Sequence, residues 1–198
     1  MSKPLSLKEE ADKLMRIKGN TKGTEFLTLA KYIRQKYGEE KLHLLERKLK
    51  ELGYPLVFDE IKPIDWYKES LNVLAFIVAK NLFGWKDLFE VGYDSPKLSI
   101  GVQLFMKFIS PKRVFKEGSK TWSKFTDVGI LEPYEYNEKE KYVIIRLRDF
   151  KLHPEMCRYY AGFLLRILQY TQKSKETSIE ESKCMFKGDS YHEYVMRW

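Results

Sequence analysis

The sequence predicts an α+β fold, with an antiparallel sheet packed against a bundle of helices in a single domain. Apolar residues recur at helical spacing through the first half of the 198-residue chain. Near Val128 the period changes, and strand-like segments alternate with turn-forming stretches. Helical and strand patterns are therefore largely segregated along the chain, which is typical of α+β proteins.

The N-terminal half reads as helices bounded by glycine and proline. Residues 1–13 form a charged N-terminal extension, and a short strand is expected over 14–18, before the turn GNTKG. Gly38 and Gly53 follow two apolar stripes and end their helices, and Pro63 can occupy the first turn of a long one. The helices predicted in this half cover residues 24–37, 40–52, 63–83 and 96–109.

The C-terminal half reads as two hairpins with one helix between them. The segment VGILEPYEYNEKEKYVIIRLRDF predicts a hairpin over 128–148 around an Asn-Glu-Lys turn. A helix is predicted over 154–170, and a last hairpin over 177–198 around the turn KGDS. We expect both hairpins to join one antiparallel sheet, together with the strand near residue 15.

The composition indicates a folded protein outside the membrane. Hydrophobic residues make up 43% of the chain and aromatic residues 15%, which is far from the composition of a disordered protein. No apolar run approaches the roughly 20 residues that span a bilayer, and the charged N-terminus lacks the apolar stretch of a signal peptide. We therefore expect a cytoplasmic protein whose two cysteines stay reduced.

The basic charge allows two interpretations. The formal net charge is +8, and the densest basic stretch, residues 110–125, sets Phe115, Trp122 and Phe125 among lysines. Such aromatics can stack on nucleic-acid bases, or they can face a core while the lysines face water. We favour the second interpretation, because basic residues are spread along the whole chain and no nucleic-acid-binding motif is present.

The segment CMFKGDSYH places two metal-ligand types around a turn. If the hairpin turns near Gly188, Cys184 and His192 lie opposite each other, with their Cβ atoms roughly 4.5–5.5 Å apart. A thiolate and an imidazole at that separation can share one metal ion. The alternatives stay open: a lone cysteine is usually a small buried hydrophobic residue, and a strand histidine is usually a surface residue.

A structural metal site needs four ligands, so two more are required. Cys157 is the only other cysteine, and Glu181 precedes Cys184 by three positions. Residues three apart on a regular strand point to opposite faces, so Glu181 needs a bulge or a long reach to join the site. His153 is the reserve ligand.

The stretches CRYYAGF from Cys157 and ESKCMFKGDSYH from Glu181 resemble the 4-vinyl reductase domain family. They are most similar to the zinc-containing sensor domains of phenol-responsive transcription activators. In that family a cysteine, a Glu-x-x-Cys and a second cysteine eight positions later bind zinc. The last position here is His192, a mild change because imidazole binds zinc well. The resemblance therefore implies a structural zinc at Cys157, Glu181, Cys184 and His192.

The segment IKGNTKGTEFLTLAKYIRQKYGEE also looks like the start of the wider haem-NO-binding and Golgi-transport-subunit superfamily. This resemblance implies that residues 14–198 form a ligand-binding domain with an apolar pocket for an apolar or aromatic small molecule. The sequence has no histidine between His43 and His153 and lacks the Tyr-x-Ser-x-Arg motif that grips haem propionates in that superfamily. Haem and simple phenols are therefore disfavoured. The candidates for the pocket wall are Phe105, Phe108, Trp122 and Tyr159.

We expect a small-molecule sensory domain rather than an enzyme. The chain has no Ser-His-Asp order and no Gly-rich phosphate loop, and four protein ligands would close the metal site. The resemblance implies a homodimer, and the sensory function implies a signalling partner protein. The alternative is a dimerising scaffold without a ligand; an enzyme or a nucleic-acid binder has less support.

Overall fold

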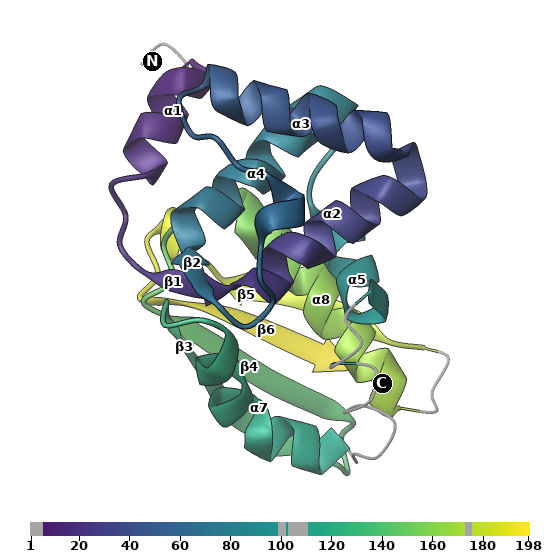
Figure 1. Cartoon of the computed structure of the whole chain (residues 1–198). Coiled ribbons are helices and arrows are strands. Elements are labelled where there is room, and N and C mark those ends of the chain that lie inside the picture. Colours follow the sequence, from purple (N-terminus) through teal and green to yellow (C-terminus); the bar gives the residue numbers. More distant parts are fainter. Residues whose placement is uncertain (1–5, 99–101, 103–110, 173–175) are drawn as a thin grey trace. The chain divides into compact units, whose positions relative to one another are not determined.

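The computed structural model describes residues 6–98, 102, 111–172 and 176–198. These residues form two compact units, Met1–Lys86 and Asp87–Trp198. The first combines helices with a two-stranded sheet, and the second combines helices with a four-stranded antiparallel sheet (Figure 1). The predicted α+β class is confirmed.

The N-terminal unit is mainly helical. Its first helix begins at a capping box, in which Ser6 and Glu9 satisfy each other's backbone N–H groups. Gly38, with a φ of +86°, separates the next two helices, and the last helix is buried around almost its whole circumference. The elements are α1 (Leu7–Leu14), β1 (Asn20–Lys22), α2 (Gly23–Tyr37), α3 (Glu39–Glu51), a 3-10 turn (Phe58–Glu60), β2 (Trp66–Lys68) and α4 (Glu69–Phe83).

Two predictions for this unit are corrected. The strand expected over 14–18 is absent, because Leu14 is the buried last residue of α1. The observed strand, β1, lies further along and pairs with β2 in a separate two-stranded sheet. The helix predicted over 63–83 begins only at Glu69, because the residues before it form β2. The helices predicted over 24–37 and 40–52 are confirmed within one residue at each end.

Residue 13, the predicted end of the N-terminal extension, lies inside α1. This helix packs on its unit: Lys8 donates a hydrogen bond to the carbonyl of Leu52, and Tyr54 donates one to Asp12. The assignment of 14–198 as one ligand-binding domain stays a prediction.

The C-terminal unit has a sheet of order β3-β4-β6-β5 in which every neighbouring pair is antiparallel. Both predicted hairpins join this sheet, so that part of the prediction is confirmed. The elements are α5 (Phe89–Leu98), α7 (Pro111–Phe125), β3 (Ile130–Asn137), β4 (Tyr142–Arg148), α8 (Glu155–Thr171), β5 (Ser178–Lys183), a 3-10 turn (Met185–Lys187) and β6 (Tyr191–Arg197).

The helix predicted to start at residue 96 is also corrected. Pro96 lies inside α5 rather than at a helix start. This helix crosses α8 at very short range, because Gly92 and Gly162 let the two backbones meet. Residues 99–101 and 103–109 of that prediction lie outside the described part of the chain.

α8 packs along one face of this sheet (Figure 1). Its buried residues form one hydrophobic cluster with residues of β4 and β6. The cluster consists of Val143, Ala161, Leu164, Leu168, Tyr194 and Met196. α8 and β6 are thereby held together, and both supply residues to the site described below.

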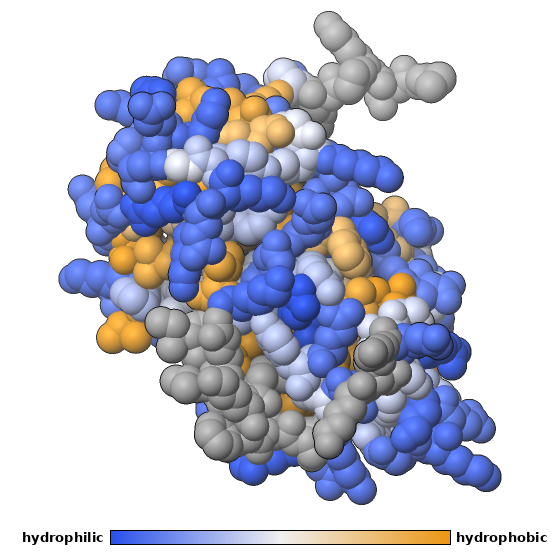
Figure 2. Space-filling view, turned by 90° about the vertical axis from the view of Figure 1, so that its right-hand side faces the viewer, coloured by the Kyte–Doolittle hydropathy of each residue, from blue (hydrophilic) through white to orange (hydrophobic). Residues whose placement is uncertain are grey.

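The observed α7 matches the amphipathic interpretation of residues 110–125. Its lysines are exposed, while the Trp122 ring packs against Phe150 and Tyr160. On the face drawn in Figure 2, hydrophilic residues cover most of the described surface and hydrophobic residues form separate patches. None of the described helices is long and apolar enough to cross a bilayer.

Candidate metal centre

Four side chains with metal-binding atoms converge in the C-terminal unit. Cys157, Glu181, Cys184 and His192 each offer one donor atom, and these atoms lie within 4.8 Å of one another. The Cys157 Sγ is 3.8 Å from the Cys184 Sγ and 3.6 Å from the His192 Nδ1, which is 3.2 Å from the Glu181 Oε1. The structure therefore brings together all four residues singled out in the sequence.

A β-bulge explains how Glu181 reaches the site. Glu181 pairs with Tyr194, but after the bulge Lys183 pairs with Glu193, so one extra residue is inserted in β5. The insertion removes the alternation that would have sent Glu181 and Cys184 to opposite faces. Sequence analysis had required such a bulge, or a long reach of the side chain, for Glu181 to join the site.

The turn after β5 fixes Cys184. Its backbone N–H donates to the Asp189 Oδ2 at 2.8 Å, and its carbonyl accepts from the N–H groups of Lys187 and Asp189. Gly188 closes the turn with a φ of +104°, a conformation that favours glycine. The Gly-Asp pair therefore holds the cysteine at the mouth of the hairpin.

The orientation of His192 is set by a contact outside the cluster. Its Nε2 lies 2.9 Å from the carbonyl oxygen of Phe150. Because a carbonyl oxygen can only accept a hydrogen bond, Nε2 carries the proton. Nδ1 is then unprotonated and faces the other three candidate metal ligands. Only 1% of His192 is exposed, so this tautomer is held away from water.

Charge at the site is uneven. Burial, followed by the nearby Glu181 and Cys184, raises the pKa of the Cys157 thiol. Burial also acts to raise the pKa of Glu181, but hydrogen bonds with His192 and the two cysteines outweigh it and lower that pKa. The Glu181 carboxylate thus faces His192 Nδ1, and a proton or a metal ion between them would satisfy both acceptors.

The donor set indicates which ions fit. Two sulfurs, one imidazole nitrogen and one carboxylate suit a borderline or soft transition-metal ion, whereas calcium and magnesium prefer oxygen alone. Donors at about 2.0–2.3 Å around a tetrahedral ion are separated by roughly 3.3–3.8 Å. The three distances given above, 3.2, 3.6 and 3.8 Å, match that range closely.

His153, the reserve ligand, is not part of this cluster. Its Nδ1 accepts a hydrogen bond from the backbone N–H of Glu155 at the start of α8. It therefore helps to begin the helix that carries Cys157.

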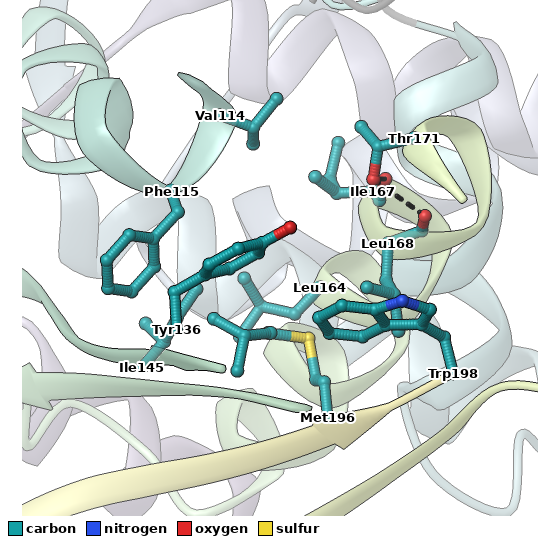
Figure 3. Close-up of a pocket in the computed structure, with 11 residues that line it drawn as sticks. Val114, Phe115, Tyr136, Ile145, Leu164, Ile167, Leu168, Thr171, Met196 and Trp198 are labelled. Carbon is teal, nitrogen blue, oxygen red and sulfur yellow. Dashed lines mark hydrogen bonds between the residues drawn. The ribbon is translucent and has the colours of Figure 1, made fainter. Parts of the chain in front are cut away.

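An apolar hollow lies further along α8 (Figure 3). Its volume is about 40 Å³, and the stacked rings of Tyr136 and Trp198 form part of its wall. Thr171 contributes the polar edge, but its hydroxyl donates to the Leu168 carbonyl. The lining residues are Val114, Phe115, Tyr136, Val143, Ile145, Leu164, Ile167, Leu168, Thr171, Met196 and Trp198.

Of the four pocket residues singled out in the sequence, the two that the structure describes, Trp122 and Tyr159, do not line this hollow. Trp122 donates to the carbonyls of Val128 and Gly129, and Tyr159 is buried and donates to Ser95. Phe105 and Phe108 lie outside the described residues. Sequence analysis did not find the lining residues because they come from α7, α8 and the two hairpins, which are far apart in the sequence. The one available sequence signal for them was the apolar stripe of α8.

Solved structures of H-NOX proteins share the fold. The chain is similar to an H-NOX protein from S. oneidensis in the Fe(II)NO ligation state, with a TM-score of 0.65 and 13% identity over 89% of this chain and 98% of that one. It is also similar to an oxygen-binding H-NOX domain related to soluble guanylate cyclases, with a TM-score of 0.63, 16% identity, and coverage of 89% and 94%. An unliganded Fe(II) H-NOX protein from K. algicida matches with a TM-score of 0.59 and 12% identity, over 89% of this chain and 95% of that one. The match covers 89% of the chain and therefore includes residues of both units.

No protein-family model and no curated protein sequence matches the chain. The assignment to the 4-vinyl reductase family is corrected by the structural comparison, which finds H-NOX proteins instead. The assignment of zinc as the cofactor is wrong on the same comparison, because the similar structures are described by haem and Fe(II) ligation.

Haem itself does not fit the residues that the structure describes. Haem iron is commonly held by histidine or cysteine. His43 is exposed and contacts Glu46, His153 accepts a hydrogen bond from the Glu155 N–H, and His192 belongs with both cysteines to the cluster. The hollow of about 40 Å³ is also far below the roughly 300–1,000 Å³ of ordinary ligand pockets.

Proposed function

We propose that the chain is a sensory domain whose C-terminal hairpin is fixed to α8 by a bound transition-metal ion. The observation that supports it is the convergence of Cys157, Glu181, Cys184 and His192 from separate elements onto one buried point. The hydrogen bond from His192 Nε2 to the Phe150 carbonyl orients the imidazole. Histidine ligands in protein metal sites are usually oriented by such a hydrogen bond from the ring nitrogen that does not bind the metal.

The metal would be structural. Four protein ligands leave no open position on a tetrahedral ion, and both cysteines and His192 are buried. Binding energy at such a site is folding energy, because the unfolded chain does not hold the four donors together. We therefore propose a binding domain and not an enzyme.

The apolar hollow is the proposed place for a small apolar or aromatic ligand, which would have to widen it, because its volume of about 40 Å³ is below that of an ordinary ligand pocket. α8 and β6 supply residues to both sites: Cys157 and Leu164 lie on α8, while His192 and Met196 lie on β6. Tyr194 connects the two sites, because it belongs to the hydrophobic cluster and donates to the carbonyl of Cys157. A ligand that moves α8 relative to β6 would therefore change the distances between the candidate metal ligands.

A sensor needs a receiver, so we propose that this domain acts on a partner protein. An oxygen-binding H-NOX domain is among the similar structures, and the shared fold gives the analogy. We also propose a cytoplasmic, reducing location, which keeps both thiols available, and a homodimer. Sedimentation at micromolar concentration tests the dimer.

Metal content is the decisive measurement. Protein purified under reducing conditions is analysed for first-row metals, then stripped and titrated with Co(II), which gives visible d–d bands and thiolate charge-transfer absorption. We expect one ion per chain and a tetrahedral cobalt spectrum that Cys184→Ser greatly weakens. His153→Gln is the matched control and should leave the spectrum unchanged. A wild-type protein without stoichiometric metal and without a cobalt spectrum would refute the proposal.

A further inference from the structure

One face of α7 is strongly basic. From residue 112 to residue 125, every exposed residue is a lysine, an arginine or a serine; they are Lys112, Arg113, Lys116, Ser119, Lys120, Ser123 and Lys124. With 3.6 residues per turn, these seven positions fall within about 140° of one another around the helix axis. This basic face of α7 therefore carries five cations and no exposed acidic or apolar side chain.

The opposite face of α7 is packed against the rest of its unit. Val114 and Phe115 line the apolar hollow (Figure 3), and the centre of the Phe115 ring lies 5.7 Å from that of Tyr136. The Trp122 indole N–H donates to the carbonyl of Val128 at 3.1 Å. These contacts set the rotation of the helix about its axis, and they keep the basic face toward solvent.

Four lysines of the basic face form a regular row. They are Lys112, Lys116, Lys120 and Lys124. Because they are four residues apart, neighbours are about 6 Å apart along the axis and the row is roughly 18 Å long. None of the four makes an ion pair within the described part of the chain. Glu117, the one acidic residue of α7, is partly buried at the edge of the face.

The Lys112 end of the row is partly compensated. A hydrogen bond from Tyr136 lowers the pKa of Glu138, in the turn between β3 and β4, and the charges of Lys141 and Lys112 contribute to this shift. The compensation comes from an exposed residue outside the helix, so it is weak in water.

The residue types of the basic face favour nucleic-acid phosphates over other anionic partners. Lysine and serine are depleted from protein–protein interfaces, whereas lysine, arginine and serine are typical contacts of phosphate groups. A helix that binds a membrane surface buries apolar side chains in it, and this face exposes none. Phe115 and Trp122 are packed inward, so they offer no platform on which the bases of a single strand could stack.

We propose that the basic face of α7 binds the phosphate backbone of a nucleic-acid duplex without reading its base sequence. One strand of a duplex presents a phosphate about every 3.4 Å along the axis, so a row roughly 18 Å long can lie along about five phosphates. The formal net charge of +8 adds attraction at longer range. This activity goes beyond the function proposed above and does not depend on the metal centre.

The interpretation of residues 110–125 made from the sequence is compatible with this proposal. It assigned the aromatic residues to a core and the lysines to water, and the structure of α7 agrees. What the sequence did not show is that one face gathers the cations without an exposed acidic residue. Backbone binding needs that face and no stacked base.

The test is the salt dependence of binding to a short fluorescent DNA duplex, followed by anisotropy with the full chain. Five phosphate contacts predict an affinity that falls about 500-fold between about 50 and 200 mM salt. Lys116→Gln combined with Lys120→Gln leaves three contacts, so the affinity should fall only about 40-fold over the same range. Glutamine has nearly the helix propensity of lysine, so α7 should keep its fold, which circular dichroism checks.

The matched control is Lys41→Gln combined with Lys50→Gln, two exposed positions of α3. It removes the same net charge and should keep the wild-type salt dependence. Equal weakening by the two double variants would overturn the proposal, because net charge and not the basic face would then cause binding. A wild-type affinity that changes only a few-fold with salt would overturn it without any variant.

Other anionic partners are compared at the same salt concentration. An RNA duplex of equal length separates the two sources of a phosphate backbone, and binding to either duplex supports the proposal. Tighter binding to a single strand would contradict it, because the contact would then involve bases. Tighter binding to phosphatidylserine vesicles or to polyglutamate would also contradict it and would assign the face to a membrane or to an acidic protein.

Discussion

Gly162→Ala should destabilise the C-terminal unit strongly, because α5 and α8 touch backbone to backbone at this position. A Cβ on residue 162 would lie 2.1 Å from the carbonyl oxygen of Phe89 and 2.7 Å from the backbone N of Tyr93. Ordinary contacts begin at 3.4 Å, so the closest overlap is 3.4 − 2.1 = 1.3 Å. Neither obstructing atom belongs to a flexible side chain, and α5 must therefore move as a whole.

The cost can be bounded. Overpacking by one methyl group typically costs about 1–3 kcal/mol, and a clash with backbone belongs at or above the upper end. Glycine to alanine inside a helix otherwise gains about 0.5–1 kcal/mol from chain entropy and helix propensity. The net loss in the free energy of unfolding should therefore be about 2–3 kcal/mol.

The matched control is Gly118→Ala in α7. Its added Cβ would meet only the side chains of Leu131, at 3.2 Å, and Pro133, at 3.8 Å. The leucine side chain can move by a few tenths of an ångström, so this variant should lose little stability or gain up to about 1 kcal/mol. The same substitution should therefore be strongly destabilising at position 162 and close to neutral or stabilising at position 118 of the same unit.

Urea unfolding followed by circular dichroism measures both variants, and the midpoint is compared at constant slope. Because α8 carries Cys157, metal-stripped protein should be used so that changes in metal affinity do not enter the comparison. A Gly162→Ala protein as stable as the wild type would show that the helices do not cross at this distance.

Two further predictions concern the metal centre. Tyr194→Phe removes the hydroxyl that donates to the Cys157 carbonyl at 3.2 Å in a buried position, so we expect a loss of about 1–2 kcal/mol in the free energy of unfolding, measured by urea titration of metal-free protein; an unchanged midpoint would show that the bond contributes nothing. Metal affinity should rise with pH, because burial raises the pKa of the Cys157 thiol, which must lose its proton to bind. Competition titrations with a chelator between about pH 6 and pH 8 test this, and at metal concentrations 100-fold above the dissociation constant the bound ion should add about 2.7 kcal/mol to stability. An affinity that does not change with pH would show that the thiol is not a ligand.

The sequence predicts this fold best where a helix has its own end signals. α2 and α3 are recognisable because each carries an apolar stripe and a glycine follows it. β1 and β2 are three residues each and gain their stability from pairing across more than forty positions of sequence, so no local pattern distinguishes them. The same reason explains why residues 63–68 were predicted as helix and 14–18 as strand.

The four candidate metal ligands could be predicted because a hairpin converts sequence spacing into distance. The turn at Gly188 sets which residues lie opposite, and the eight positions between Cys184 and His192 then follow from the ladder. Glu181 required the bulge, which the sequence does not mark. The partner of His192 outside the cluster, the carbonyl of Phe150, was also not predictable, because any backbone carbonyl can accept.

The nature of the ion is a different kind of question from the place where it binds. The hairpin geometry fixes where the donors of Cys157, Glu181, Cys184 and His192 meet, but several transition-metal ions accept sulfur, nitrogen and oxygen together. Which ion binds therefore depends on the relative affinities of the ions and on which metals are available to the protein. Neither can be derived from the spacing of the ligands. The prediction of zinc came from the family resemblance alone. It was wrong, because the fold matches H-NOX structures that are described with Fe(II). A donor set predicts a class of ions, and direct metal analysis has to name the member.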